Sequence, residues 1–289
     1  MNSQQRPNIQ GKIIARRPLG STGLSVSCLG LGTVKLGRAT GVKYPHPVKI
    51  PTDEEARALL SHAHELGINL IDTAPAYGQS ENRLGGLLAG QRDRWVIVTK
   101  VGEQFDGEKS TYDFSPRAIT QSIEQSLLRL RTDHVDIVLV HSDGLIEGDL
   151  VNTGVIDALA RAKSRGWCRS LGASTKTVAG GLHAVEHGDV VMVMLTPEYT
   201  EEVSVIEAAR QAGRGVLIKK ALSSGHAMMP RLGNETLVGK PESESAKQTS
   251  VNGIHPLAFA VNVPGVTSVI VGTTSPKHLR ENVDAVIQG

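Results

Sequence analysis

Short apolar runs alternate with longer amphipathic segments along most of the chain. The apolar runs have the length of buried strands, and the amphipathic segments have the spacing of helices that pack one face against a sheet. Ile119, Ile123, Leu127 and Leu130, for example, fall on one helical face. The expected strands are residues 27–32, 68–71, 95–99, 136–140, 168–172, 190–195, 215–218 and 268–271.

Start and stop signals bound several of the expected helices. Thr52-Asp53-Glu54-Glu55 has the pattern of a capping box, and Gly67 ends the same segment. Ser115-Pro116 and Ser275-Pro276 each place a capping serine before a proline that suits the first helical turn. Further helices are expected at about 80–89, 153–165, 177–187, 200–212 and 246–262.

Eight strands, each followed by a helix, predict a parallel sheet, because parallel neighbours need a long crossover between them. A closed (β/α)8 TIM barrel is the leading architecture, and an open doubly wound sheet is the alternative. Residues 13–26, around the turn Gly20-Ser21-Thr22-Gly23, are expected to form an N-terminal β-hairpin that closes the bottom of the barrel. No linker divides the 289 residues, so residues 1–289 are expected to form a single domain.

Charge and composition give no sign of a nucleic acid or a membrane as a partner. The 31 basic residues nearly balance the 29 acidic ones, for a net charge of +2. No apolar run approaches the ~18 residues of a membrane-spanning helix, and residues 1–17 lack the apolar core of a signal peptide. Cys28 and Cys168 are expected to be small buried thiols. A cytoplasmic protein is therefore expected.

Three of the expected strands run into residues that carry chemistry. Asp72 and Tyr77 follow the second strand, Lys100 ends the third, and His141 ends the fourth. The carboxyl ends of parallel strands meet at one rim of a barrel. A phenol ordinarily loses its proton near pH ~10, a nearby ammonium lowers that pKa, and a carboxylate can hold the ammonium in place. Together with a histidine that orients a carbonyl, the set suits proton transfer to or from an oxygen.

Taken singly, each of these residues has a structural explanation. Asp72 could cap a helix, Tyr77 could be a packed aromatic, Lys100 could be solvated, and His141 could be a satisfied structural histidine. Four suitable residue types in suitable positions favour the catalytic interpretation. The chain shows no cluster with metal-ligand spacing and no G-x-S-x-G motif, so neither a metal site nor an activated serine is expected.

The run Asp72-Thr73-Ala74-Pro75-Ala76-Tyr77-Gly78-Gln79-Ser80-Glu81, with Lys100 and His141 in order behind it, resembles the aldo-keto reductase family. The resemblance extends from Leu19-Gly20 to the last helix. It implies hydride transfer between C4 of a nicotinamide and a carbonyl carbon, with Asp72, Tyr77, Lys100 and His141 as the catalytic tetrad. In that scheme Tyr77 protonates the carbonyl oxygen, Lys100 lowers the pKa of Tyr77, and His141 hydrogen-bonds the substrate oxygen.

The resemblance also implies NADPH, or less often NADH, bound in an extended pose without a Rossmann domain. Gly30-Leu31-Gly32 agrees, because Lys35 stands where a G-x-G-x-x-G fingerprint needs its third glycine. The implied cofactor-binding residues are Ser174, Thr175, Met192, Lys219, Lys220, Leu222, Gly272, Thr273, Thr274, Lys277, His278, Arg280 and Asn282.

Several of these positions depart from the family's pattern. Ser174-Thr175 stands for a Ser-Asn pair, and Met192 stands for a glutamine, whose hydrogen bonds a thioether cannot make. Lys219-Lys220-Ala221-Leu222 replaces a stacking aromatic residue and Ser-Pro-Leu, so the lysines could approach the pyrophosphate instead. The positions aligned with the 2′-phosphate site are Gly272, Thr273 and His278, with Thr274, Lys277 and Arg280 close by. Hydroxyls ahead of a helix N-terminus suit an anion, which favours NADPH over NADH.

The expected activity is that of an NAD(P)H-dependent oxidoreductase that reduces an aldehyde or ketone, or acts in reverse on a sugar. Loops 33–51, 102–114, 142–152 and 223–245 are expected to form the substrate's entrance, with Phe105, Tyr112 and Phe114 as its aromatic lining. A cofactor-binding sensor or accessory module with little turnover is the alternative. A metal-dependent barrel hydrolase or isomerase is disfavoured because no ligand set is visible. The expected assembly is a monomer or a small homo-oligomer.

Overall fold

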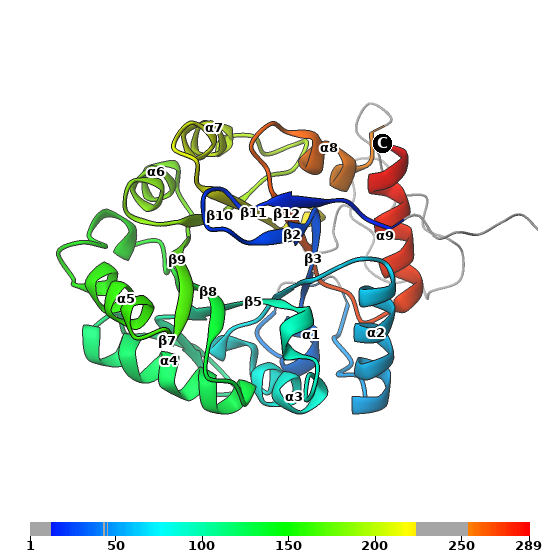
Figure 1. Ribbon diagram of the computed structural model, residues 1–289, viewed down its shortest axis with the longest axis horizontal. Coiled ribbons are helices and arrows are strands. Elements are labelled where there is room, and N and C mark those ends of the chain that lie inside the picture. The colour runs from blue at the N-terminus through cyan, green and yellow to red at the C-terminus, as the bar shows by residue number, and fades with distance from the viewer. Residues whose placement is uncertain (1–12, 43, 45, 224–253) are drawn as a thin grey trace, which may run out of the picture.

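The computed structural model describes residues 13–42, 44, 46–223 and 254–289. Within these residues, eight parallel strands form a closed barrel in the order β3-β4-β5-β8-β9-β10-β11-β12 (Figure 1). This confirms the predicted (β/α)8 TIM barrel and excludes the open doubly wound sheet. The strands are β3 (Leu29–Gly32), β4 (Leu70–Asp72), β5 (Val96–Val101), β8 (Val135–His141), β9 (Cys168–Ser174), β10 (Val190–Met194), β11 (Gly215–Lys219) and β12 (Ser268–Val271).

Helices surround the barrel and begin where the capping residues predict. Thr52 and Glu55 form the expected capping box, and Ser115 and Ser275 each accept a hydrogen bond from a backbone N–H of the first turn. The described helices are α1 (Val34–Gly37), α2 (Asp53–Glu65), α3 (Ser80–Leu87), α4 (Pro116–Leu130), α5 (Val155–Ser164), α6 (Val178–His187), α7 (Val203–Gln211), α8 (Pro256–Asn262) and α9 (Pro276–Gln288). Short 3-10 turns lie at Pro75–Tyr77 (η1), Arg92–Arg94 (η2) and Ile146–Gly148 (η3).

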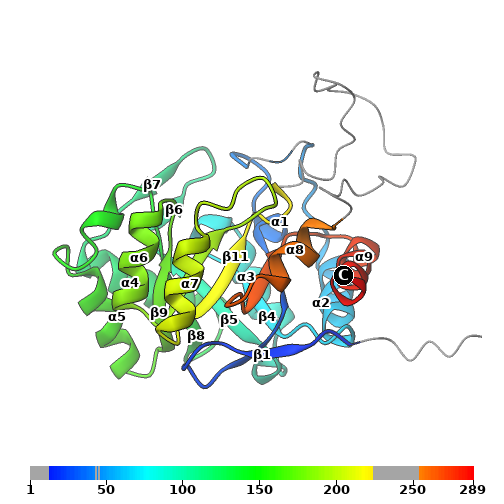
Figure 2. The ribbon, with the colours of Figure 1, turned by 90° about the horizontal axis from the view of Figure 1, so that it is seen from above.

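The predicted N-terminal hairpin is present as the antiparallel strands β1 (Arg16–Pro18) and β2 (Ser25–Ser27). Asn69, just before β4, fixes it by accepting from the Ser27 amide at 2.7 Å and donating to the Ser25 carbonyl at 2.9 Å. Leu19 and Leu24 of the hairpin pack in one cluster with residues from inside the barrel. The hairpin therefore closes the N-terminal end of the barrel, and Figure 2 shows β1 at the end opposite β6 and β7.

Strand residues alternate between two apolar layers, as the pleat of a barrel requires. Val98, Leu139 and Leu217 face the interior, where they pack with the hairpin. Ile97 and Val138 belong to the larger cluster between the strands and the helices. The hairpin covers only the N-terminal end of the barrel, so polar side chains can line a cavity at the carboxyl ends of the strands.

Residues 102–114 form a hairpin where the sequence predicts only a loop. Its strands are β6 (Glu103–Phe105) and β7 (Ser110–Tyr112), which pair antiparallel. Asp106 shapes the turn by accepting from the amides of Glu108 and Lys109, both at 2.9 Å. Three-residue strands are too short to show a period of two, so the pattern of the sequence does not reveal them.

Two other segments differ from the prediction or lie outside the described residues. Loop 33–51 contains the short helix α1. The helix expected at 246–262 is described only from Pro256, and residues 224–253 of the expected loop and helix lie outside the described part of the chain.

A buried carboxylate joins α3 to its neighbours. Glu81 has 0% of its surface exposed. It accepts from Thr99 Oγ1 at 2.5 Å on β5, and from Ser126 Oγ at 3.2 Å and Arg129 Nε at 2.7 Å on α4. Each hydrogen bond that the Glu81 carboxylate accepts offsets part of the free-energy cost of removing its charge from water.

We expect Arg129→Met to lower the free energy of unfolding by about 3 kcal/mol, because it leaves the Glu81 charge buried without its counterion. Urea denaturation followed by circular dichroism measures this. Arg210→Met is the matched control, since Arg210 pairs with Glu207 on the exposed side of α7 and should unfold close to the original protein. Equal destabilisation by both substitutions would contradict the structural role given to Glu81.

Candidate active site

Three neighbouring strands bring the four predicted catalytic residues to one rim of the barrel. Asp72 ends β4, Lys100 lies near the end of β5, and His141 ends β8. Tyr77 follows in η1, which turns at Gly78 with a φ of 60° before α3 begins. A glycine suits that left-handed conformation, and an added Cβ there would meet the backbone of Gly37.

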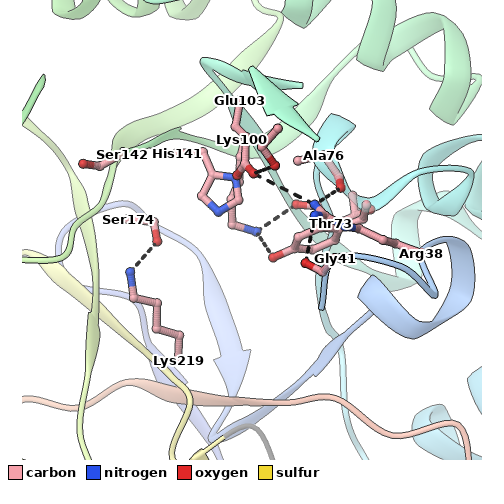
Figure 3. Close-up of polar contacts among 12 residues, drawn as sticks. Arg38, Gly41, Thr73, Ala76, Lys100, Glu103, His141, Ser142, Ser174 and Lys219 are labelled. Carbon is pink, nitrogen blue, oxygen red and sulfur yellow. Dashed lines mark hydrogen bonds and ion pairs between the residues drawn. The ribbon is translucent and has the colours of Figure 1, made fainter. Parts of the chain in front are cut away.

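Lys100 is the centre of this group. Its ammonium Nζ lies 2.5 Å from Asp72 Oδ1, 3.0 Å from the Tyr77 hydroxyl oxygen and 2.9 Å from the Thr73 carbonyl oxygen. Figure 3 shows Lys100 reaching toward Thr73 beside His141. The three contacts use all three donors of the ammonium, and only 1% of the side chain is exposed. Lys100 is therefore held in one orientation against the phenol.

The protonation of Tyr77 differs from the sequence prediction. Burial raises the pKa of Tyr77 well above its ordinary value, and the negative charges of Asp72 and Glu103 raise it further. The Tyr77 hydroxyl also donates to Asp72 Oδ2 at 3.3 Å, which favours the neutral phenol. The pKa is therefore raised rather than lowered, because burial and the two carboxylates dominate, and the lowering by Lys100 alone stays a prediction. Tyr77 therefore stays protonated at neutral pH.

His141 contacts a carboxylate that the sequence analysis did not identify. Its Nδ1 lies 2.7 Å from Glu103 Oε2 on β6, and Ser110 Oγ donates to Glu103 Oε1 at 2.5 Å. Burial acts to raise the pKa of Glu103, but His141, Ser110 and Arg38 outweigh it and lower the pKa to about 2. Burial lowers the pKa of His141, although Glu103 opposes this. The ionised Glu103 therefore lies at ion-pair distance from the imidazole ring. Its position three residues after Lys100 is the signal that the sequence offered for it.

We expect Glu103→Ala to lower kcat/KM about tenfold without changing the dissociation constant of the nicotinamide cofactor that the sequence resemblance implies, because the His141 ring loses the carboxylate against its Nδ1. Steady-state kinetics and calorimetric titration measure the two quantities. Glu108→Ala, in the exposed turn of the same hairpin, serves as the control and should behave like the original protein. If Glu103→Ala matches that control in kcat/KM, Glu103 does not position His141.

The rim encloses a cavity of about 490 Å³. All four predicted catalytic residues line it, together with seven of the predicted cofactor positions. Those seven are Ser174, Thr175, Met192, Lys219, Lys220, Leu222 and Gly272. Lys35 and Tyr44 also line it, and both belong to loop 33–51, which is predicted to form part of the substrate's entrance. The cavity is large enough for a nicotinamide and a small substrate beside Tyr77.

Six predicted cofactor positions lie away from the cavity lining. Thr273 is buried and accepts from the Ser275 amide at 3.1 Å, just before α9. Asn282 is buried within α9, whereas Lys277 and His278 are exposed in its first turn. Gly272 connects the cavity to this segment along the chain. The remaining positions are Thr274 and Arg280, both partly buried.

Lys219 ends β11, on the side of the barrel opposite β5 and Lys100. Its Nζ donates to Ser174 Oγ at 2.9 Å and to the Thr175 carbonyl at 2.5 Å, as Figure 3 shows for Ser174. Burial lowers the pKa of Lys219 to about 7, against the opposing charge of Glu202. The buried Thr175 Oγ1 has no hydrogen-bond partner among the described residues. Within the described part of the chain, Thr175 therefore has a buried hydroxyl without a partner beside the cavity.

Other kinds of site are not seen in the part of the chain that the structure describes. No three His, Cys, Asp or Glu side chains are placed there to hold a metal ion. None of the described helices is long and apolar enough to cross a membrane.

Comparison with known proteins identifies a matching family, a similar solved structure and similar sequences. A model of the aldo/keto reductase family matches residues 28–227. A solved structure from Pseudomonas aeruginosa, described as an aldo-keto reductase, is 44% identical with a TM-score of 0.81 over 97% of this chain and 98% of its own. L-galactose dehydrogenase from Arabidopsis thaliana is 30% identical over 95% of this chain and 89% of its own. Pyridoxal 4-dehydrogenase from Microbacterium luteolum is 26% identical over 94% and 93%.

Proposed function

The chain belongs to the aldo/keto reductase family of oxidoreductases, and we propose that it reduces an aldehyde, ketone or sugar carbonyl with NADPH, or runs the reverse oxidation. One observation carries the proposal. Lys100 Nζ joins Asp72 and the Tyr77 hydroxyl in the wall of the same cavity that seven predicted cofactor positions line. The proton donor Tyr77 and the lysine that contacts it thus line a cavity with room for a cofactor.

Tyr77 acts as the general acid for the carbonyl oxygen in this proposal. NADPH, when bound, supplies the hydride to the carbonyl carbon. The Tyr77 hydroxyl gives its proton to the oxygen as negative charge develops there, and Lys100 stabilises the phenolate left behind. Because its pKa is raised, the Tyr77 phenol is protonated before each turnover. When doubly protonated, His141 keeps its Nδ1–H on Glu103 and donates its Nε2–H to the substrate oxygen from the other side.

The chain's residues fit NADPH in two regions. The unpartnered Thr175 Oγ1, with Ser174 and Lys219, offers hydrogen bonds for the nicotinamide amide. Met192 lies in the inner apolar cluster and offers only packing. For the adenosine end, we propose the segment from Gly272 into α9, where a helix N-terminus and nearby basic side chains suit a phosphate. The residues of that segment are Thr273, Thr274, Lys277, His278, Arg280 and Asn282.

We expect NADPH to bind more tightly than NADH, because the 2′-phosphate gains contacts with the hydroxyls and cations at the start of α9. Isothermal titration of the protein with each cofactor measures the two dissociation constants. Equal constants, or tighter binding of NADH, would remove the 2′-phosphate site from the proposal while leaving the catalytic group intact.

A small carbonyl compound or a sugar is the proposed substrate class. The relatives named above are called dehydrogenases of L-galactose and of pyridoxal. The hairpin β6–β7 stands at the same end of the barrel as the rim and carries stacked rings, with Tyr112 and Phe114 centroids 6.0 Å apart. Aromatic faces of this kind suit the apolar face of a sugar or an aromatic aldehyde. We also propose that the whole chain acts as one domain in the cytoplasm, as a monomer or small homo-oligomer.

The test is the loss of NADPH absorbance in the near ultraviolet with a panel of aldehydes, ketones and sugars. The proposal expects turnover with at least one class of carbonyl compound. Tight NADPH binding without turnover across the panel would instead favour an accessory or sensing module. A chelator in the assay should leave the rate unchanged, because the chemistry assigned to these residues uses no metal.

A further inference from the structure

Lys219 places an ammonium in the part of the cavity where the nicotinamide ring is proposed to bind. It ends β11, lines the same cavity as Tyr77, and donates to Ser174 Oγ and the Thr175 carbonyl. Ser174 and Thr175 are the residues proposed above to bind the nicotinamide amide. A nicotinamide ring held there, and reaching the carbonyl beside Tyr77, must therefore pass close to Lys219 Nζ.

We propose that Lys219 makes the protein discriminate between the two oxidation states of its cofactor, disfavouring NADP⁺ and retaining NADPH. The inference rests on the proposed function, since it assumes that the nicotinamide enters this cavity. The oxidised ring carries a positive charge and the reduced ring carries none, while the rest of the molecule is the same. Repulsion by an ammonium at contact distance, weakly screened in a cavity, therefore acts on NADP⁺ alone.

The neighbours of Lys219 decide whether its charge can be removed. Glu202, before α7, is buried, and its Oε1 has no hydrogen-bond partner among the described residues. Glu147 in η3 is also negative, whereas Lys100, Lys220 and His141 are or can be positive. The balance of burial and these charges sets the pKa of Lys219 at about 7. Lys219 can therefore release its proton near neutral pH when a second positive charge arrives.

This gives a pH dependence with a definite sign. If NADP⁺ binds only the neutral amine, its affinity follows the neutral fraction of Lys219, which rises about tenfold from pH 6 to pH 8. Both cofactors carry the 2′-phosphate, so the effect of its titration on binding cancels in the ratio of the NADPH and NADP⁺ dissociation constants. We expect that ratio to shift toward NADP⁺ by about tenfold over this range in the original protein.

Two substitutions separate the charge of Lys219 from its shape. Lys219→Met removes the charge, so the ratio should be independent of pH and stay at the value most favourable to NADP⁺. Lys219→Arg keeps the charge at every pH, so the ratio should also be flat but at the value least favourable to NADP⁺. Lys109→Met, in the exposed β6–β7 turn, is the control and should keep the pH dependence of the original protein.

Isothermal titration with NADPH and with NADP⁺ at about pH 6, 7 and 8 measures all the constants without turnover. In buffers of different ionisation enthalpy, NADP⁺ should release about half a proton at pH 7 and NADPH should release less. The same tenfold shift in Lys219→Met would overturn the inference and point to His141 as the titrating group. Failure of both cofactors to bind the original protein would overturn the proposed function as well, which distinguishes the two.

Discussion

Replacing Tyr77 with phenylalanine is expected to lower kcat about a thousandfold while NADPH binds as before. The substitution removes the hydroxyl that lies 3.0 Å from Lys100 Nζ and that would protonate the carbonyl oxygen. The ring itself remains, so the packing of η1 against α1 should persist. The rate of NADPH consumption and a calorimetric titration with NADPH measure the two effects.

Tyr199→Phe is the matched control, because this tyrosine does not line the cavity and lies at the surface. It should retain the turnover of the original protein. Turnover of Tyr77→Phe at the level of this control would remove Tyr77 from the mechanism.

The raised pKa of Tyr77 adds a prediction about pH to the same experiment. Reduction uses the protonated phenol, so its rate should stay level through mildly alkaline pH and fall only near the raised pKa. Alcohol oxidation uses the phenolate, so its rate should rise with pH over the same range. A reduction rate that falls through neutral pH would point to another acid.

Replacing Lys100 with methionine is expected to lower both activity and stability. The phenolate formed at Tyr77 loses its only contacting cation among the described residues, and we expect kcat to fall at least about a hundredfold. Asp72 keeps a buried charge without the ammonium 2.5 Å away, so the free energy of unfolding should fall by about 3 kcal/mol. Turnover assays and urea denaturation measure the two losses separately.

The double variant Asp72→Asn with Lys100→Met distinguishes structure from catalysis. Removing both charges should restore most of the lost stability, because no buried ion remains unpaired. Activity should stay low, because nothing stabilises the Tyr77 phenolate. Recovery of activity together with stability would mean that Lys100 acts only by holding the fold.

The barrel could be predicted because each strand–helix repeat carries the same sequence patterns. Apolar strands, caps such as Thr52 and Ser115, and amphipathic helices all point to the same topology. The rim residues followed from the barrel, since parallel strands place their carboxyl ends together. Asp72, Lys100 and His141 lie on three neighbouring strands for this reason.

Contacts made across the cavity could not be predicted, because they depend on distances between segments rather than on any local pattern. Glu103 meets His141 through a hairpin too short to show a period. The pKa of Tyr77 depends on burial and on Asp72 at 3.3 Å, and the sequence shows neither. Strand periodicity placed Lys219 directly after the expected strand 215–218, but not its bonds to Ser174, which ends β9, and to the next residue, Thr175.

Hydride transfer beside Tyr77 can be followed directly with a deuterium label. The protein is given NADPH deuterated at C4 on each face in turn, with a carbonyl compound that it consumes, and the alcohol is examined by mass spectrometry. One of the two labelled cofactors should transfer its deuterium to the carbonyl carbon, and Tyr77→Phe should slow this transfer. An alcohol that carries no deuterium from either cofactor would contradict hydride transfer in the cavity beside Tyr77 and Lys100.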